Sequence, residues 1–200
     1  MALSRYQSIR RLALALLIGL AFALLLVVRS SSGGEFHEYV EAVGLGLIVI
    51  GIVGRMWCTL YIGGRKAAEV VSMGPYSITR NPLYVFSSIA AAGVGAQTGS
   101  VLLGLIFMVV CALCFLIVIR REEEFLTVEL GAPYLAYMAA VPRFWPSFSR
   151  FKDQTELTVR TKLIYRTLAD GLVFFLAVPA FEFVEHLQLN DIVPVLLRMS

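Results

Sequence analysis

Apolar runs close to the length of a membrane-crossing helix constrain this chain more than any other feature. The hydrocarbon core of a bilayer is about 30 Å thick, so a spanning helix needs about 20 apolar residues. Five runs reach or approach this length: Leu12–Val28, Val40–Ile62, Leu83–Ala96 with an extension to about Gly99, Val101–Ile119 and Leu168–Val184. The sequence therefore predicts an all-α fold, an integral membrane helical bundle of about five transmembrane helices.

The composition agrees with this prediction. The chain is 58% hydrophobic and 16% charged, whereas a soluble domain is nearer to half apolar and about a quarter charged. With 200 residues we expect one membrane domain, residues 1–200, with no room for a second sizeable one. The net charge of +3 is mild and does not indicate a nucleic-acid-binding protein, which would show a clustered basic face.

The positions of the basic residues predict the orientation in the membrane. Basic residues occupy the N-terminus, the segment between the second and third runs, and the long stretch after the fourth run: Arg5, Arg10, Arg11, Arg65, Lys66, Arg80, Arg120, Arg121, Arg143, Arg150, Lys152, Arg160, Lys162 and Arg166. The intervening segments "SSSGGEFHEYVE" and "AQTGS" contain none. By the positive-inside rule we expect a cytoplasmic N-terminus, five spans and an external C-terminus.

The first apolar run has a second interpretation, a cleaved secretory signal, because three arginines precede it. We favour a transmembrane helix, since the run is longer than a usual signal core and no Ala-x-Ala cleavage site follows it.

The three cysteines, Cys58, Cys111 and Cys114, all lie in apolar surroundings. Cys111 and Cys114 have C-x-x-C spacing, but thiolates are disfavoured inside an apolar run. We expect packing thiols, with neither a disulfide framework nor a metal site.

A first polar cluster, "GPYSITRNPLYV", directly precedes the third apolar run. Gly74-Pro75 indicates a turn. Asn81 followed by Pro82 is typical of a helix start, with Asn as the cap and Pro at the first helical position. Starting a helix does not account for Tyr76, Arg80 and Tyr84 beside it. A helix N-terminus favours an anion, and aromatic rings stack on planar groups, so a ligand site is the second interpretation.

A second polar cluster, "RREEEFLTVELGAPYLAYMAAVPRFWP", follows the fourth run. We predict a helix over Arg120–Leu130, a stop at Gly131 and a short cytoplasmic helix around Tyr134–Tyr137, whose two tyrosines share one face. Adjacent carboxylates at Glu122–Glu124 repel one another near the hydrocarbon edge. Arg120 and Arg121 are placed to offset them, so an internal salt bridge is the alternative to a ligand site.

The short segment "AQTGS" makes the third and fourth runs a tight antiparallel hairpin, which brings both clusters to the cytoplasmic face. Carboxylates, aromatic rings and a helix N-terminus together suit a ligand with a cation or ribose hydroxyls, an adenine and a carboxylate. S-adenosylmethionine has all of these, whereas a nicotinamide dinucleotide needs more positive charge for its phosphates.

Over residues 70–148 these clusters resemble the membrane-embedded isoprenylcysteine carboxyl methyltransferases and the related phospholipid N-methyltransferases. The matching residues are Gly74, Tyr76, Arg80, Asn81, Pro82, Tyr84, Glu122, Glu123, Gly131, Tyr134, Tyr137, Val141, Pro142, Arg143, Phe144 and Pro146. Asn81 stands where those families often have His, and Leu130 where Phe is usual. The Asn variant resembles the bacterial members, which implies a bacterial inner membrane as the location. Residues 149–200, with the fifth run, lie outside the resemblance and form a C-terminal extension.

The resemblance implies methyl transfer from S-adenosyl-L-methionine to a lipophilic, membrane-dissolved acceptor, either a carboxylate as in isoprenylcysteine or a lipid amine. It implies partners from the bilayer, a lipophilic small molecule or lipidated substrate, and no nucleic acid. The implied cofactor-binding residues are Tyr76, Arg80, Asn81, Pro82, Tyr84, Glu122, Glu123, Tyr134 and Tyr137. The implied catalytic residues are Arg120, Arg121, Glu122 and Arg143: an arginine would orient an anionic acceptor, and a glutamate would take the proton of an amine.

Two other functions remain open from the sequence. One is an NADPH-dependent sterol-type double-bond reductase, a class that resembles this family in its C-terminal half but is usually larger. The other is a non-catalytic membrane scaffold, because glycines that favour close helix packing recur in two of the apolar runs. These glycines are Gly44, Gly46, Gly51, Gly54, Gly93 and Gly95.

Overall fold

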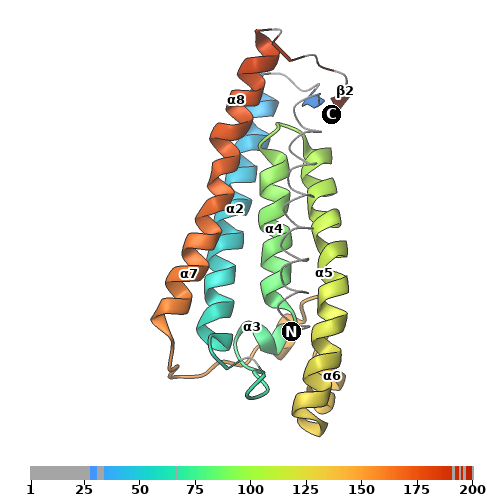
Figure 1. The fold of residues 1–200 in the computed structure, drawn as a ribbon, viewed down its shortest axis with the longest axis vertical. Coiled ribbons are helices and arrows are strands. Elements are labelled where there is room, and N and C mark those ends of the chain that lie inside the picture. The colour runs from blue at the N-terminus through green and yellow to red at the C-terminus, as the bar shows by residue number, and fades with distance from the viewer. Residues whose placement is uncertain are drawn as a thin grey trace, which may run out of the picture.

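The computed structural model describes residues 28–30, 34–65, 67–190, 192–193, 195 and 197–199. Within them the helices α2 (Glu35–Ile62), α4 (Pro82–Ala96) and α5 (Val101–Leu130) run side by side along the long axis of the molecule (Figure 1). The first predicted span, Leu12–Val28, lies outside these residues except for Val28.

Three helical segments among the described residues are long and apolar enough to cross a membrane: α2, α5 and the segment Thr161–Leu189. The fourth apolar helix, α4, is shorter. The last four predicted runs are therefore helical, and the predicted membrane character is confirmed. Five crossings stay a prediction.

Helix α5 continues well beyond its apolar run. Its 30 residues correspond to about 45 Å at 1.5 Å per residue, longer than the hydrocarbon core of a bilayer. It ends at Leu130 because Gly131 adopts a φ of +59°, a left-handed conformation that glycine tolerates at helix ends. The short helix α6 (Ala132–Ala140) follows, which confirms the predicted helix, stop and second helix.

Close packing of α2 on α4 depends on glycines. A Cβ added at Gly51 would lie 2.6 Å from the Ala90 Cβ and 2.9 Å from the Phe86 carbonyl oxygen. Gly46, in the same helix, has nothing within 4 Å. The packing interpretation therefore holds for Gly51 and not for Gly46.

The third membrane-length segment contains a local change of helix type. It consists of α7 (Thr161–Leu172), the 3₁₀ turn η2 (Val173–Leu176) and α8 (Ala177–Leu189). Pro179 lacks an N–H and its ring crowds the carbonyl four residues earlier, at Phe175, so the regular α-helical bonding pattern is interrupted there.

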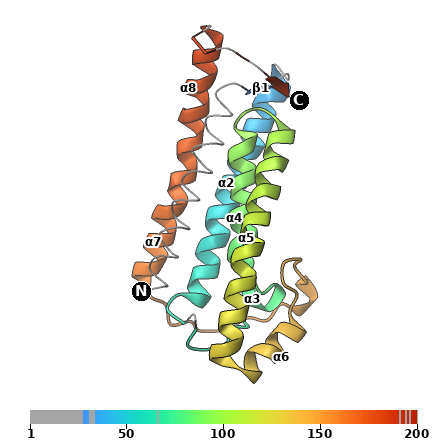
Figure 2. The ribbon, with the colours of Figure 1, turned by 45° about the vertical axis from the view of Figure 1, so that its right-hand side comes forward.

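Two features were not expected from an all-α fold or from the sequence alone. A two-stranded parallel ladder pairs β1 (Val28–Ser30) with β2 (Leu197–Met199). At the opposite end of the bundle, α3 (Pro75–Ile78), α6 and the 3₁₀ turn η1 (Phe148–Arg150) gather beside the ends of α4 and α5 (Figure 2).

The chain after α6 folds back onto the segment before α4. The Arg80 N–H donates to the Pro142 carbonyl at 2.9 Å, and the Ser147 N–H donates to the Ile78 carbonyl at 2.9 Å. The Gly74 N–H donates to the Lys152 carbonyl at 2.7 Å. These backbone bonds join the two polar clusters.

Candidate functional site

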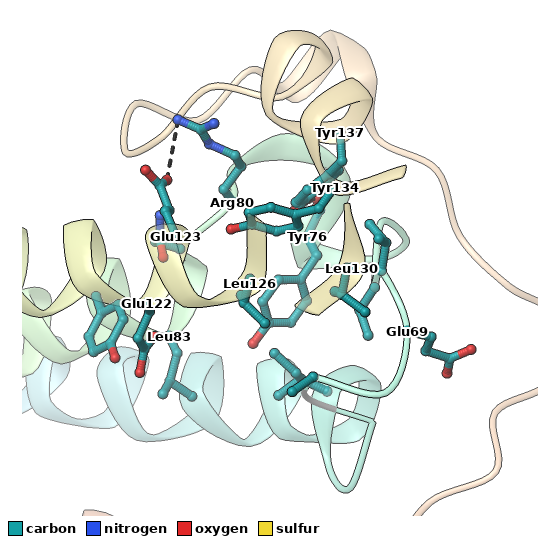
Figure 3. A pocket seen from close by; sticks show the side chains of 16 residues that line it. Glu69, Tyr76, Arg80, Leu83, Glu122, Glu123, Leu126, Leu130, Tyr134 and Tyr137 are labelled. Carbon is teal, nitrogen blue, oxygen red and sulfur yellow. Dashed lines mark hydrogen bonds and ion pairs between the residues drawn. The ribbon is translucent and has the colours of Figure 1, made fainter. Parts of the chain in front are cut away.

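A cleft opens between the segment that precedes α4, the last turns of α5 and helix α6 (Figure 3). About 750 Å³ between its walls is not occupied by atoms, open solvent at its mouth included. Its lining residues are Ile62, Ala67, Glu69, Val70, Val71, Tyr76, Arg80, Asn81, Leu83, Tyr84, Glu122, Glu123, Leu126, Leu130, Tyr134 and Tyr137.

The start of α4 forms one wall of the cleft. Pro82 occupies the first helical turn, where its missing N–H costs nothing, and it is buried outside the lining. Asn81 is at the N-cap position, but its side chain does not cap the helix. Its Nδ2 donates instead to the Arg143 carbonyl oxygen at 3.1 Å. The predicted capping bond is therefore wrong, and Asn81 connects α4 to the segment after α6.

A buried ion cluster forms the floor between the two polar segments. Glu123 Oε1 lies 3.3 Å from Arg80 Nη2, and these side chains are 7% and 10% exposed. Arg143 approaches the other carboxylate oxygen, Oε2, with Nη2 at 2.8 Å and Nε at 2.9 Å. Two guanidinium groups thus neutralise one buried carboxylate, which is the condition under which such a charge is tolerated.

The cations that pair with Glu123 are not its sequence neighbours. The expected salt bridge to Arg120 or Arg121 is absent for Glu123 in the described residues, where Arg80 and Arg143 take that place. Both Arg120 and Arg121 are exposed and lie outside the cleft lining.

Two buried polar atoms beside the cleft have unused bonding capacity. Within the described residues, Arg80 Nε and Glu123 Oε1 make no hydrogen bond. Arg80 Nη1 does donate to the Met138 carbonyl at 3.1 Å, which fixes the guanidinium plane. Glu123 Oε1 keeps its ion-pair contact with Arg80 Nη2, so one N–H donor and one carboxylate oxygen of this pair can each make a further bond.

Three buried tyrosines complete the wall formed by α3 and α6. The Tyr137 hydroxyl donates to the Tyr76 carbonyl at 2.8 Å, and the Tyr134 and Tyr137 rings lie 5.9 Å apart. Burial raises the pKa of Tyr134 to about 12, with the Glu123 carboxylate adding to the effect. Burial also raises the pKa values of Tyr76 and Tyr137. These phenols therefore stay protonated and act as neutral donors and aromatic surface near neutral pH.

The structure places most of the predicted cofactor residues around this one cleft. The lining includes Tyr76, Arg80, Asn81, Tyr84, Glu122, Glu123, Tyr134 and Tyr137. Among the predicted catalytic residues, Glu122 lines the cleft. Arg143 does not line the cleft but binds Glu123, which does, and the Arg143 side chain is 44% exposed. The chemical roles of all these residues stay predictions.

Several apolar residues of the cleft were not predicted. Val70 and Val71 belong to the irregular segment between α2 and α3, and Leu83, Leu126 and Leu130 extend the apolar side of the wall. The irregular segment has no periodic pattern that places it against α5. Leu126 and Leu130 are one helical turn apart from each other on α5, a spacing that does indicate a shared face.

Known proteins resemble this chain in sequence. The sequence profile described as phospholipid methyltransferase matches residues 40–132. The nickel-cobalt-cadmium resistance protein NccN of Alcaligenes xylosoxydans xylosoxydans is 37% identical over 147 residues, covering 72% of this chain and 68% of NccN. The cobalt-zinc-cadmium resistance protein CzcN of Cupriavidus metallidurans is 36% identical over 132 residues, covering 65% of this chain and 61% of CzcN.

The similarity therefore extends over less than two thirds of CzcN and slightly more than two thirds of NccN. No solved structure matches this chain.

Proposed function

Because this chain belongs to the phospholipid methyltransferase family, we propose that it is an S-adenosylmethionine-dependent methyltransferase acting on a lipophilic acceptor from the membrane. The proposal is supported by one observation above all: the two polar segments line one cleft, and Arg80 of the first segment contacts Glu123 of the second. When bound, S-adenosylmethionine supplies an electrophilic methyl group attached to a positively charged sulfur.

The cleft has the donor set that this cofactor requires. Arg80 Nε, which donates no hydrogen bond within the described residues, suits a carboxylate or hydroxyl. Glu123 Oε1, which is ion-paired with Arg80 but accepts no hydrogen bond there, suits an ammonium or ribose hydroxyl. Glu122 adds a second carboxylate, and Tyr76, Tyr84 and Tyr134 provide flat surfaces for an adenine ring.

The acceptor is proposed to be an amine in preference to a carboxylate. Arg143 and Arg80 are both paired with Glu123, so an anionic acceptor would have to compete with this carboxylate for them. A protonated amine is attracted to a cleft lined by the two carboxylates Glu122 and Glu123. We propose that Glu122 takes the proton that the amine must lose before it becomes a nucleophile. Apolar side chains, Leu83 and Leu126, line the same cleft and suit a lipid chain.

We place the cleft on the cytoplasmic side of a bacterial membrane. The end of the bundle that holds the cleft carries Arg65, Arg80, Arg143 and Arg150. The other end carries Glu35 and Glu38 at the start of α2, with Arg29 and Arg198 in the ladder. This asymmetry follows the positive-inside rule. Both relatives are named as metal resistance proteins, so we further propose that the methylation serves the response of the membrane to divalent transition metals.

Ligand binding to the detergent-solubilised protein tests the cofactor. S-adenosylhomocysteine is expected to raise the melting temperature. NADPH is not, because Arg80 is the one cation among the described lining residues and it is paired with Glu123, whereas a 2′-phosphate requires several cations. Glu122→Gln should weaken S-adenosylhomocysteine binding about tenfold or more. Glu124→Gln, which changes an exposed carboxylate two residues further along α5, should leave this binding unchanged. Stabilisation by NADPH alone would favour a reductase, and no stabilisation by either ligand would favour a scaffold.

Methyl-labelled S-adenosylmethionine tests the reaction. Incubated with bacterial membranes that contain the protein, it should transfer label to extractable lipids, and membranes without the protein should not. Mild base separates the two acceptor classes, because methyl esters release methanol and N-methyl groups do not. Base-stable label is expected, and base-labile label would identify a carboxylate acceptor.

A further inference from the structure

Far from the cleft, three side chains with metal-ligand chemistry converge between the beginning of α2 and helix α8. These are His37 and Glu41 of α2 and Glu185 of α8, whose ligand atoms all lie within 4.8 Å of one another. The start of α2, the α4–α5 turn and α8 all lie at the end of the bundle opposite α3 and α6 (Figure 1). The cluster is therefore spatially separate from the proposed methyltransferase site.

The imidazole of His37 is fixed in orientation. His37 and Glu41 are one helical turn apart, and His37 Nε2 lies 3.2 Å from Glu41 Oε1. On the other side of the ring, a Cβ added at Gly99 would lie 1.9 Å from His37 Nδ1. The ring is thus packed against the α4–α5 turn with Nε2 directed towards the carboxylates. Gln97 holds the same turn on α2, because its Nε2 donates to the Glu41 carbonyl at 2.9 Å.

The cluster also brings several carboxylates close to one buried histidine nitrogen. His37 Nε2 is buried and makes no hydrogen bond within the described part of the chain. The two carboxylates that face it repel each other, and Glu182, one turn before Glu185 on α8, adds a further negative charge nearby. A cation at the centre of the three ligand atoms would offset the repulsion and bind Nε2 together with the two carboxylates.

We infer that His37, Glu41 and Glu185 form a binding site for a divalent transition-metal ion of the Zn²⁺, Co²⁺ or Ni²⁺ class. One imidazole nitrogen with two carboxylate oxygens is a donor set for these ions, whereas Mg²⁺ and Ca²⁺ prefer oxygen alone. Metal–ligand bonds of about 2.0–2.2 Å hold ligand atoms at most about 4.4 Å apart, so small side-chain rotations close the site. The sequence does not place these ligands together, because His37 and Glu41 are more than 140 residues before Glu185.

The site has a structural consequence, because its ligands come from two helices. Glu185 belongs to the helix that follows the 3₁₀ turn η2, and the other two ligands belong to α2. A bound ion therefore clamps α8 to the start of α2 and stabilises the last helical segment against detachment.

Cobalt binding to the full chain tests this inference. The protein, purified without a polyhistidine tag and stripped with a chelator, is titrated with Co²⁺, and the visible absorption of the bound ion is recorded. One equivalent of Co²⁺ per chain is expected, displaced by Zn²⁺, with a rise in melting temperature that the chelator reverses. If the wild-type chain takes up no Co²⁺, the inference is wrong.

The two histidines of the chain supply a matched pair of variants. His37→Ala should weaken Co²⁺ binding about tenfold or more, and His186→Ala, which removes the exposed imidazole next to Glu185, should leave it unchanged. Glu185→Gln should weaken Co²⁺ binding as His37→Ala does. Glu38→Gln changes an exposed carboxylate of α2 and should bind Co²⁺ as the wild type does. Equal Co²⁺ binding by His37→Ala and wild type would overturn the inference.

Circular dichroism and gel filtration establish that each variant is folded. His37 and Glu185 lie on different helices. If one of these two variants fails to fold, Co²⁺ binding by the other variant still tests the inference. The outcome is also independent of the proposed methyltransferase function, since S-adenosylhomocysteine binding is measured separately at the opposite end of the bundle.

Discussion

Arg80, just before α4, and Glu123, near the end of α5, form an ion pair with 3.3 Å between Nη2 and Oε1 and with both side chains at most 10% exposed. Arg143, from the segment after α6, binds the second oxygen of the same carboxylate. Glu123 thus holds together three parts of the chain that surround the cleft.

Glu123→Ala is expected to destabilise the fold by about 3–5 kcal/mol, because it leaves the buried Arg80 guanidinium without its counter-charge. The measurement is the free energy of unfolding, or the melting temperature, of the detergent-solubilised protein. Glu124→Ala removes a carboxylate from the next, exposed position of the same helix and should change stability by less than about 0.5 kcal/mol. Equal effects of both substitutions would show that the ion cluster does not stabilise the fold.

The parts of the fold that could be predicted are those set by local sequence. Apolar length located α2, α4, α5 and the last helical segment, and a glycine after a polar helical stretch located the end of α5. The short "AQTGS" segment indicated a hairpin, which was enough to predict that the two polar clusters meet. Hydrophobic periodicity and turn residues act over a few residues, so they are readable without the tertiary structure.

The partners of Glu123 could not be predicted in this way. Arg120 is three residues away on the same helix and is the natural partner by local spacing. The structure pairs Glu123 with Arg80 and Arg143 instead, since the chain after α6 returns to the start of α4. The same return explains why Asn81 bonds the Arg143 carbonyl instead of capping its helix.

Glycine substitutions in α2 should have opposite effects at two positions of the same helix. Gly51→Ala places a methyl group 2.6 Å from the Ala90 Cβ and 2.9 Å from the Phe86 carbonyl oxygen, so α2 and α4 must move apart, at a cost of about 1–3 kcal/mol. Gly46→Ala meets nothing within 4 Å and should stabilise the helix by about 0.5–1 kcal/mol. Melting temperatures of the two variants measure the difference, and a gain at Gly51 would contradict the packing of α2 on α4.

Tyr137→Phe tests the contact that joins α6 to α3. The substitution removes the 2.8 Å bond from the hydroxyl to the Tyr76 carbonyl and leaves that carbonyl without this donor, for an expected loss of about 1–3 kcal/mol. Tyr165→Phe is the matched control, because that side chain is 69% exposed and its replacement should be neutral. Thermal unfolding of both variants decides whether the hydroxyl stabilises the wall of the cleft.

Alkaline pH should weaken the fold through Tyr134. Burial, with a contribution from the Glu123 carboxylate, raises the pKa of this phenol to about 12, whereas an unfolded tyrosine has a pKa of about 10. Between these values the unfolded chain releases the proton while the folded chain keeps it, so the free energy of unfolding falls as the pH rises from about 10 to about 12. Tyr134→Phe removes this contribution and should make the decline in melting temperature over that interval shallower.

The decline should not vanish, because burial also raises the pKa values of Tyr76 and Tyr137. Tyr165→Phe, at an exposed ring, should keep the wild-type slope, and an unchanged slope in Tyr134→Phe would mean that Tyr134 is not buried beside Glu123.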